Sequence, residues 1–329
     1  MMPRRQRRLT TASIAIVAVA YFGTATYLQR RAIAAQSASI TPAAAAPARI
    51  SADELMRVVR ELASPKYEGR LAGSSGGRAA RAYIAAELKA IGVEPLSPSG
   101  YEEPFQFGAV RGAANLAGRV RGTNAAAKVM LVTAHYDHLG IRGGQLYPGA
   151  DDNASGVAAM LGLARYLQAH PLRRDVIVAA FDAEEADLEG SKAFVAHPPV
   201  PLARMAIDVN LDMLSRNDAN EIFAAGAYHY PWLAPIVADV QRRSAVKVLA
   251  GHDRPVGSAG MVDDWTMQSD HGSFHKAGVP FIYFGVEDHP DYHKPTDTAD
   301  KIDPRFYRNV VEMILDAVLE LDARVDGVR

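Results

Sequence analysis

The sequence predicts an α/β protein in which one central, mixed and mainly parallel β-sheet is flanked by helices on both faces. Short apolar runs suited to buried strands alternate along the chain with segments whose apolar residues recur at helical spacing. Hydrophobic residues make up 49% and charged residues 22% of the 329 residues, which is ordinary for a globular protein with a sizeable core. No internal repeat or second linker follows residue 50, so we expect a single domain over residues 50–329.

The elements of this domain follow in order. Two helices are expected ahead of the sheet, over residues 51–62 and 77–91, and Ser51 with Glu54 forms a capping box at the start of the first. Compact apolar runs predict buried strands, and amphipathic stripes predict two later helices. The strands are expected at 129–134, 176–181, 205–211 and 279–284, and the helices at 154–168 and 306–321.

The amino end has the pattern of a targeting segment. Four arginines among residues 4–8 precede an uncharged, mostly apolar run over residues 9–28. Residues 1–31 are therefore expected to be either a cleaved signal peptide or a membrane anchor, and the sequence leaves both open. Residues 32–49, rich in Ala, Pro and Ser, are expected to be a flexible linker. We therefore expect the protein to be exported and periplasmic, either soluble after cleavage or anchored to the inner membrane by the amino-terminal helix.

Charge and cysteine content exclude several classes of function. Lys and Arg total 36 and Asp and Glu total 37, so the chain lacks the basic excess of a nucleic-acid-binding protein. The chain contains no cysteine, which excludes disulfides, thiolate metal sites and a cysteine nucleophile. A metal site in this protein must therefore use His, Asp and Glu.

Polar side chains follow each of the expected buried strands. Ligands of open α/β sheets bind beyond the carboxyl ends of the strands, so these side chains are expected to meet in one site. Two carboxylates about 4 Å apart repel by ~4 kcal/mol at an effective dielectric constant of 20, so four together require a cation. No Lys or Arg lies in the segments concerned, and imidazoles mixed with carboxylates favour zinc, with cobalt or manganese as substitutes. The four carboxylates are those of Asp152, Glu184, Glu185 and Asp212.

The order of the motifs resembles that of the M28 family of zinc metallopeptidases, in particular its bacterial aminopeptidases. The resemblance rests on His135-Tyr136-Asp137-His138, Gly149-Ala150-Asp151-Asp152-Asn153, Phe181-Asp182-Ala183-Glu184-Glu185, Asn210-Leu211-Asp212-Met213 and Tyr292-His293-Lys294-Pro295. The segment from Glu68 to Gly73 is similar to one that precedes the first sheet strand in that family. The resemblance covers residue 51 to the end of the chain and implies the zinc-peptidase (phosphorylase/hydrolase-like) fold.

The resemblance implies two zinc ions and a role for each motif. Asp152 would bridge both ions, and Glu184 would be the general base. The other implied ligands are His135 and Asp212 for one ion and Glu185 and His293 for the other. A cis peptide bond after Asp152 is also implied.

Two of these roles have a physical rationale in the local sequence. His135 and Asp137 leave an extended segment on the same face, so Asp137 can accept the second N–H of the His135 imidazole. Glu184 and Glu185 point in different directions on an extended chain, which lets one bind metal while the other handles a proton.

The implied activity is that of an aminopeptidase that removes residues from peptides with a free N-terminus. Alternatives on the same fold are a one-zinc glutaminyl cyclase-like acyltransferase and a carboxypeptidase or dipeptidase, for which Arg216 is a candidate pocket residue. A non-catalytic binding ectodomain is a remote alternative. The roles of Asp270 and His271, the preferred N-terminal residue and the oligomeric state stay open. Ser215 stands where members of the family commonly have glycine.

Overall fold

The computed structural model describes residues 48–258 and 263–327, and the chain divides into two units, Met1–Ala48 and Arg49–Arg329. The expected leader, residues 1–31, and nearly all of the expected linker, residues 32–49, lie outside the described residues, so both stay predictions. Within the described ranges, every helix is too short or too polar to cross a bilayer. The fold below is that of the second unit.

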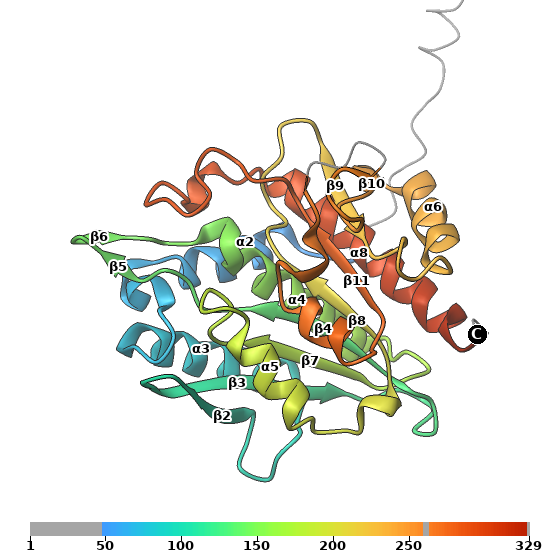
Figure 1. The fold of residues 1–329 in the computed structure, drawn as a ribbon, viewed down its shortest axis with the longest axis horizontal. Coiled ribbons are helices and arrows are strands. Elements are labelled where there is room, and N and C mark those ends of the chain that lie inside the picture. The colour runs from blue at the N-terminus through green and yellow to red at the C-terminus, as the bar shows by residue number, and fades with distance from the viewer. Residues whose placement is uncertain (1–47, 259–262, 328–329) are drawn as a thin grey trace, which may run out of the picture. The chain divides into compact units, whose positions relative to one another are not determined.

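A mixed sheet of nine strands forms the centre of this unit (Figure 1). Its middle is parallel and consists, in spatial order, of β7 (Val176–Phe181), β4 (Val129–His135), β8 (Met205–Leu211) and β11 (Phe281–Gly285). The flanks are partly antiparallel. One flank holds β3 (Val110–Val120), β1 (Glu94–Pro95) and β2 (Glu102–Phe107), and the other holds β9 (Glu221–Ala225) and β10 (Lys247–Ala250).

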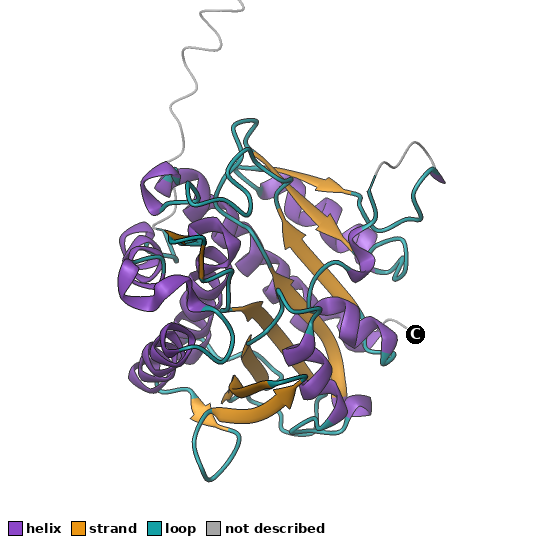
Figure 2. Cartoon of the chain, turned by 60° about the vertical axis from the view of Figure 1, so that its left-hand side comes forward, coloured by secondary structure: helices purple, strands orange, loops and turns teal. Residues whose placement is uncertain are grey.

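Helices cover both faces of the sheet (Figure 2). The larger core lies on one face, against α2 (Ala52–Leu62), α3 (Ser75–Ile91), α4 (Gly156–Ala169), α6 (Leu233–Arg243) and α8 (Pro304–Arg324). The opposite face packs against α5 (Glu189–Ala196) and α7 (His271–Lys276) through Phe194 and Phe274. The predicted fold class is therefore confirmed.

The strongly apolar elements lie where the sequence predicts them, within a few residues at their ends. The strand expected at 279–284 begins only at Phe281, after Pro280, which has no backbone N–H to donate to a neighbouring strand. The helix expected from residue 154 begins at Gly156, because the irregular segment Ala150–Ser155 precedes it. The sequence did not predict β1, β2, β3, β9, β10, α5, α6 or α7, nor the small hairpin of β5 (Ile141–Arg142) and β6 (Gln145–Leu146).

The parallel middle of the sheet positions the candidate site. Because β7, β4, β8 and β11 run in the same direction, their carboxyl ends meet along one edge. The segment Ala150–Ser155 at the start of α4 adds a further loop, and Asn153 accepts a hydrogen bond there from the Gly156 N–H at 2.8 Å. The Asp152–Asn153 peptide bond is cis, as the resemblance implied.

Candidate metal centre

The structure brings the site residues expected from the sequence together at the carboxyl edge of the sheet. His135 is the last residue of β4, and Asp212 directly follows β8. Glu184 and Glu185 lie in the loop after β7, and His293 lies in the loop between β11 and α8. Segments far apart in the sequence thus meet in one place.

One group of donors surrounds the His135 imidazole. Its Nε2 atom lies 3.3 Å from Oδ1 of Asp212 and 3.4 Å from Oδ1 of Asp152. Oε2 of Glu184 is farther away, at 4.0 Å from the same nitrogen. His135, Asp152 and Asp212 are all buried.

A second group surrounds the His293 imidazole. Its Nε2 atom lies 3.1 Å from Oδ2 of Asp152 and 3.2 Å from Oε2 of Glu185. The two oxygens of Asp152 therefore face different imidazoles, Oδ1 toward His135 and Oδ2 toward His293. This is the arrangement that a carboxylate bridging two cations requires.

The donor separations fit the dimensions of a zinc site. Tetrahedral zinc with bonds of ~2.0–2.1 Å keeps its ligand atoms about 3.3 Å apart, close to the four separations measured around His135 and His293. In the described part of the chain, only imidazoles come within ion-pairing distance of the carboxylates of Asp152, Asp212, Glu184 and Glu185. Buried like charges without a Lys or Arg partner form a set of donors that suits a divalent cation.

Asp137 contacts the loop that carries the glutamates rather than the His135 ring alone. Its carboxylate accepts the main-chain N–H of Glu184 at 3.0 Å and that of Glu185 at 3.3 Å. Oδ1 of Asp137 is 3.6 Å from Nδ1 of His135, while the main-chain oxygen of Asp137 is nearer to that nitrogen, at 3.3 Å. Asp137 therefore fixes the Glu184–Glu185 loop, a function that the spacing of His135 and Asp137 did not reveal.

The electrostatic environment shifts the pKa values of Glu184 and Glu185 in opposite directions. Burial raises the pKa of Glu184 well above its usual value, and the negative charge of Asp212 adds to this effect. Burial also acts on Glu185, but hydrogen bonds from His138 and His293 leave the pKa of its carboxyl below the usual value. Glu184 is thus the better proton acceptor, and Glu185 the better anionic ligand.

Comparison with known proteins identifies the family. The model of Peptidase family M28 matches residues 115–318, which is more than half of the chain. The chain belongs to the M28 family. Aminopeptidase YwaD of Bacillus subtilis is 32% identical over 204 residues, which cover 58% of this M28 chain and 41% of YwaD. The chain thus spans about two fifths of that relative's length.

Solved structures share the fold of this M28 chain. The zinc aminopeptidase BSAP from Bacillus subtilis superposes with a TM-score of 0.65 at 18% identity, covering 82% of this chain and 95% of BSAP. The glutaminyl cyclase of Porphyromonas gingivalis superposes with a TM-score of 0.66 at 19% identity, covering 82% of this chain and 98% of the cyclase. At these identities the similarity concerns the fold.

The M28 site contains a third imidazole to which the sequence gave no role. His138 is fully buried, and its Nδ1 atom lies 2.7 Å from Oε1 of Glu185 and 3.6 Å from Oδ2 of Asp152. With Asp152 and Glu185 it forms a group whose donor atoms all lie within 4.8 Å of one another. In the sequence, the feature that could have indicated a role for His138 is its position three residues after His135. An ordinary polar residue in the loop after a strand would occupy the same position, so this spacing does not identify a site residue.

Hydrogen bonds join the two segments that carry Asp152 and Asp212. The Asn153 side chain donates to the Leu211 carbonyl at 2.9 Å, and the Ser155 hydroxyl oxygen accepts the Leu214 N–H at 3.0 Å. Oδ1 of Asp151 accepts both the N–H and the hydroxyl of Ser215, at 2.7 and 2.6 Å. Ser215 thus helps to hold the segment of Asp152 against that of Asp212 through Asp151, and glycine could supply only the N–H.

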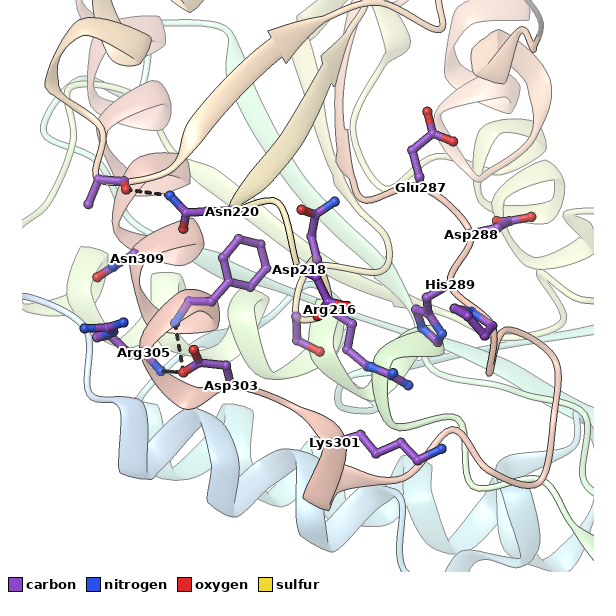
Figure 3. Close-up of a pocket in the computed structure, with 15 residues that line it drawn as sticks. Arg216, Asp218, Asn220, Glu287, Asp288, His289, Lys301, Asp303, Arg305 and Asn309 are labelled. Carbon is purple, nitrogen blue, oxygen red and sulfur yellow. Dashed lines mark hydrogen bonds between the residues drawn. The ribbon is translucent and has the colours of Figure 1, made fainter.

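A charged cavity of about 680 Å³ lies beside this network (Figure 3). Ser215 and His289 line it, and the Nε2 atom of His289 is 3.2 Å from Oδ2 of the buried Asp151. Arg216 also lines the cavity, but its Nη1 atom donates to Oδ2 of Asp291 at 2.7 Å. The Arg216 cation is therefore already paired within the protein.

Asp270 is a buried carboxylate next to the site. Its side chain is fully buried, and neither oxygen has a hydrogen-bond partner among the described residues. Burial raises the pKa of Asp270 to about 7. The charge of His135 opposes this rise, and the charges of Asp137 and Asp212 add to it. Its neighbour His271 instead contacts the Trp265 carbonyl through Nε2 at 2.9 Å.

Proposed function

We propose that this protein is a zinc-dependent aminopeptidase that binds two ions and removes N-terminal residues from peptides. The observation that carries the proposal is the placement of Asp152, whose two oxygens lie 3.4 Å from His135 Nε2 and 3.1 Å from His293 Nε2. His135 and Asp212 would hold one ion, and Glu185 and His293 would hold the other. Asp152 would bridge them.

Each residue of the site has a separate role in the proposed reaction. Bound zinc supplies Lewis acidity, which lowers the pKa of water and polarises the scissile carbonyl. Glu184 takes the proton from the attacking water and then delivers it to the departing amine. Asp137 keeps Glu184 in place through the Glu184 N–H. Asp152 and Asp212 are themselves buried, which strengthens their electrostatic interactions with a bound cation.

The test is hydrolysis of a panel of aminoacyl p-nitroanilides by the zinc-loaded protein. We expect turnover that a chelator abolishes and that N-acetylation of the substrate prevents, since the substrate needs a free α-amino group. Elemental analysis of the active protein is expected to give two metal ions per chain. Zinc-loaded protein that hydrolyses no member of the panel would contradict the proposal.

A glutaminyl cyclase-like acyltransferase is the second candidate, because a glutaminyl cyclase shares the fold at a TM-score of 0.66. That reading requires one ion. The same preparation is therefore assayed with a peptide that begins with glutamine, and pyroglutamate formation with one zinc per chain would favour the cyclase. A carboxypeptidase lacks comparable support, since the Arg216 guanidinium is paired with Asp291.

We also propose that the protein is exported to the periplasm by its amino-terminal segment. The support is the arginine cluster followed by the uncharged run over residues 9–28. Fractionation of cells that express the full chain tests this: a soluble, shortened periplasmic product indicates cleavage, and full-length protein in the inner membrane indicates an anchor. Full-length protein in the cytosol would contradict export.

A further inference from the structure

Arg70 is fully buried yet has no carboxylate as a hydrogen-bond partner. Arginine is rarely buried without an acidic partner, because an isolated charge in the protein interior is costly. The four hydrogen bonds of the Arg70 guanidinium all go to main-chain carbonyl oxygens. This unusual arrangement requires an explanation.

The four carbonyls belong to three separate segments. Nε donates to the Tyr136 oxygen at 2.8 Å, and Tyr136 lies between His135 and Asp137. Nη1 and Nη2 donate to the oxygens of Pro148 and Gly149 at 2.6 and 2.8 Å, just before the segment that carries Asp152. Nη1 also donates to the Leu62 carbonyl at the end of α2, at 2.8 Å.

The main chain of Arg70 adds a further bond to the same loop. The His138 N–H donates to the Arg70 carbonyl at 3.3 Å. The preceding Gly69 packs so closely on the strand-end loops that a Cβ there would lie 2.5 Å from the Gly140 oxygen. Side chain and backbone around Arg70 therefore hold both ligand-bearing loops from one side.

The compensating negative charge for Arg70 comes from the metal site at longer range. Burial lowers the pKa of Arg70 to about 10, so its guanidinium remains charged at neutral pH. The charges of Asp152, Asp297, Asp137 and Glu185 oppose that effect. The Arg70 side chain is thus oriented by carbonyls and stabilised by the field of the site carboxylates.

We propose that Arg70 is a positioning residue of the metal centre, which fixes the loop of His135 and the loop of Asp152 at the separation that a shared divalent cation needs. The inference rests on the proposed function in assuming that these residues bind metal. A planar guanidinium with fixed donors holds several carbonyls at once, whereas an ammonium group on a flexible stem does not fix their relative positions.

The test compares Arg70→Lys with Arg174→Lys. Arg174 is also fully buried and lies just before β7, but its guanidinium pairs with Asp322 and donates to the Lys128 carbonyl at the amino end of β4, at the edge of the sheet opposite the candidate metal centre. Zinc affinity is measured by competition with a chromophoric chelator, and the geometry of the site by the visible spectrum of the cobalt-loaded protein. Thermal unfolding of both variants reports the general cost of losing a buried arginine.

We expect Arg70→Lys to weaken zinc binding by about tenfold or more, the range known for residues that orient metal ligands, and to alter the cobalt spectrum. Arg174→Lys is expected to lower the unfolding temperature while leaving zinc affinity within about twofold of wild type, because Arg174 contacts no ligand-bearing loop. Equal zinc affinity and equal spectra for Arg70→Lys and wild type would overturn the proposal.

A variant that folds only with metal still gives a result. In that case the zinc concentration needed for refolding is compared between Arg70→Lys and Arg174→Lys, and an equal requirement overturns the proposal. Wild-type protein that binds zinc but hydrolyses no substrate would contradict the proposed activity and leave the role of Arg70 standing. Wild-type protein that binds no zinc would overturn both.

Discussion

Glu184 and Glu185 show how two adjacent residues of one type acquire different roles. Both main-chain N–H groups are held by Asp137, so the loop is fixed and the two side chains diverge. Burial raises the pKa of Glu184, while imidazoles keep the pKa of Glu185 low. The division of labour follows from what surrounds each carboxylate.

Replacing Glu184 by Gln is expected to reduce kcat by about 100- to 10,000-fold, because the amide cannot accept the proton from water. Zinc content is expected to stay at the wild-type level, since Glu184 is the most distant carboxylate of its group, 4.0 Å from His135 Nε2. Steady-state kinetics and elemental analysis check both parts. Glu189→Gln, at the half-buried first residue of α5, is the matched control and should leave kcat unchanged.

Removing the Ser215 hydroxyl tests the contacts between the loops of Asp152 and Asp212. Ser215→Ala keeps the N–H bond to Asp151 but loses the hydroxyl bond, so we expect a loss of about 1 kcal/mol in unfolding free energy. Zinc affinity should fall by less than the ~10-fold typical of a direct ligand partner. Denaturant unfolding and chelator competition measure these changes, with Ser99→Ala at the surface as control. A stability equal to wild type would contradict the importance of this bond.

The meeting of His135, Glu184, Glu185 and Asp212 could be predicted because these residues end or closely follow strands of the sheet, whereas the residues that hold them in place could not be predicted. His135 and Asp212 lie directly at strand ends, where the fold class alone places a site. The roles of Arg70, His138 and Ser215 depend on contacts between segments distant in the sequence. Such contacts have no periodicity or spacing from which they could be predicted.

At the scale of elements, apolar strands were predictable and the strands flanking them were not. The residues of β7 are all buried and strongly apolar, so the run itself identifies the strand. The outer strand β2 alternates between half-buried and exposed positions and contains Pro104 and two glutamates, which is atypical of a strand. The middle of β3 is buried, but its Ala and Gly residues have little β propensity. The strand is recognised in the structure by its pairing with β2 and β7 and not by its own sequence.

Glu103 on β2 allows a test of such an element through pH. Burial raises the pKa of Glu103 to about 7, above the ~4.3 of an unfolded chain. The folded state therefore favours the protonated carboxyl, and stability is lost as pH rises from about 4 through 7. The free energy of unfolding of Glu103→Gln is expected to match that of wild type at pH 4. At pH 8 it is expected to be higher by on the order of 1 kcal/mol, a value reduced to allow for the partial exposure of the side chain.

Thermal unfolding at both pH values checks this expectation. Glu102→Gln is the matched control, because Glu102 lies on the exposed face of the same strand and pairs with Arg81 at 3.1 Å. The Glu102→Gln variant should be no more stable than wild type at pH 8. A Glu103→Gln variant that is equally stabilised at pH 4 and pH 8 would point to packing rather than ionisation.

At the scale of the molecule, the fold concentrates buried negative charge at one edge of its central sheet. Asp152, Asp212 and Asp137 are all buried there, and Arg70 is fixed by carbonyls behind them. The formal net charge of the whole chain is only −1, so this local excess reflects the arrangement of residues and not the composition. A sheet that gathers like charges in this way loses stability unless cations bind there.

Removing zinc is therefore expected to destabilise the whole domain. Ligands that bind only the folded state add about 4 kcal/mol when present at 1,000 times their dissociation constant, so a chelator should lower the unfolding temperature by roughly 10 °C. Zinc added back should restore the midpoint and saturate at two equivalents, whereas magnesium, which prefers all-oxygen ligands, should not. Differential scanning calorimetry measures the shift. An unchanged midpoint in chelator would mean that protonated imidazoles balance the carboxylates at this edge without metal; although burial opposes it, Asp152 and Glu185 raise the pKa of His293 to about 10.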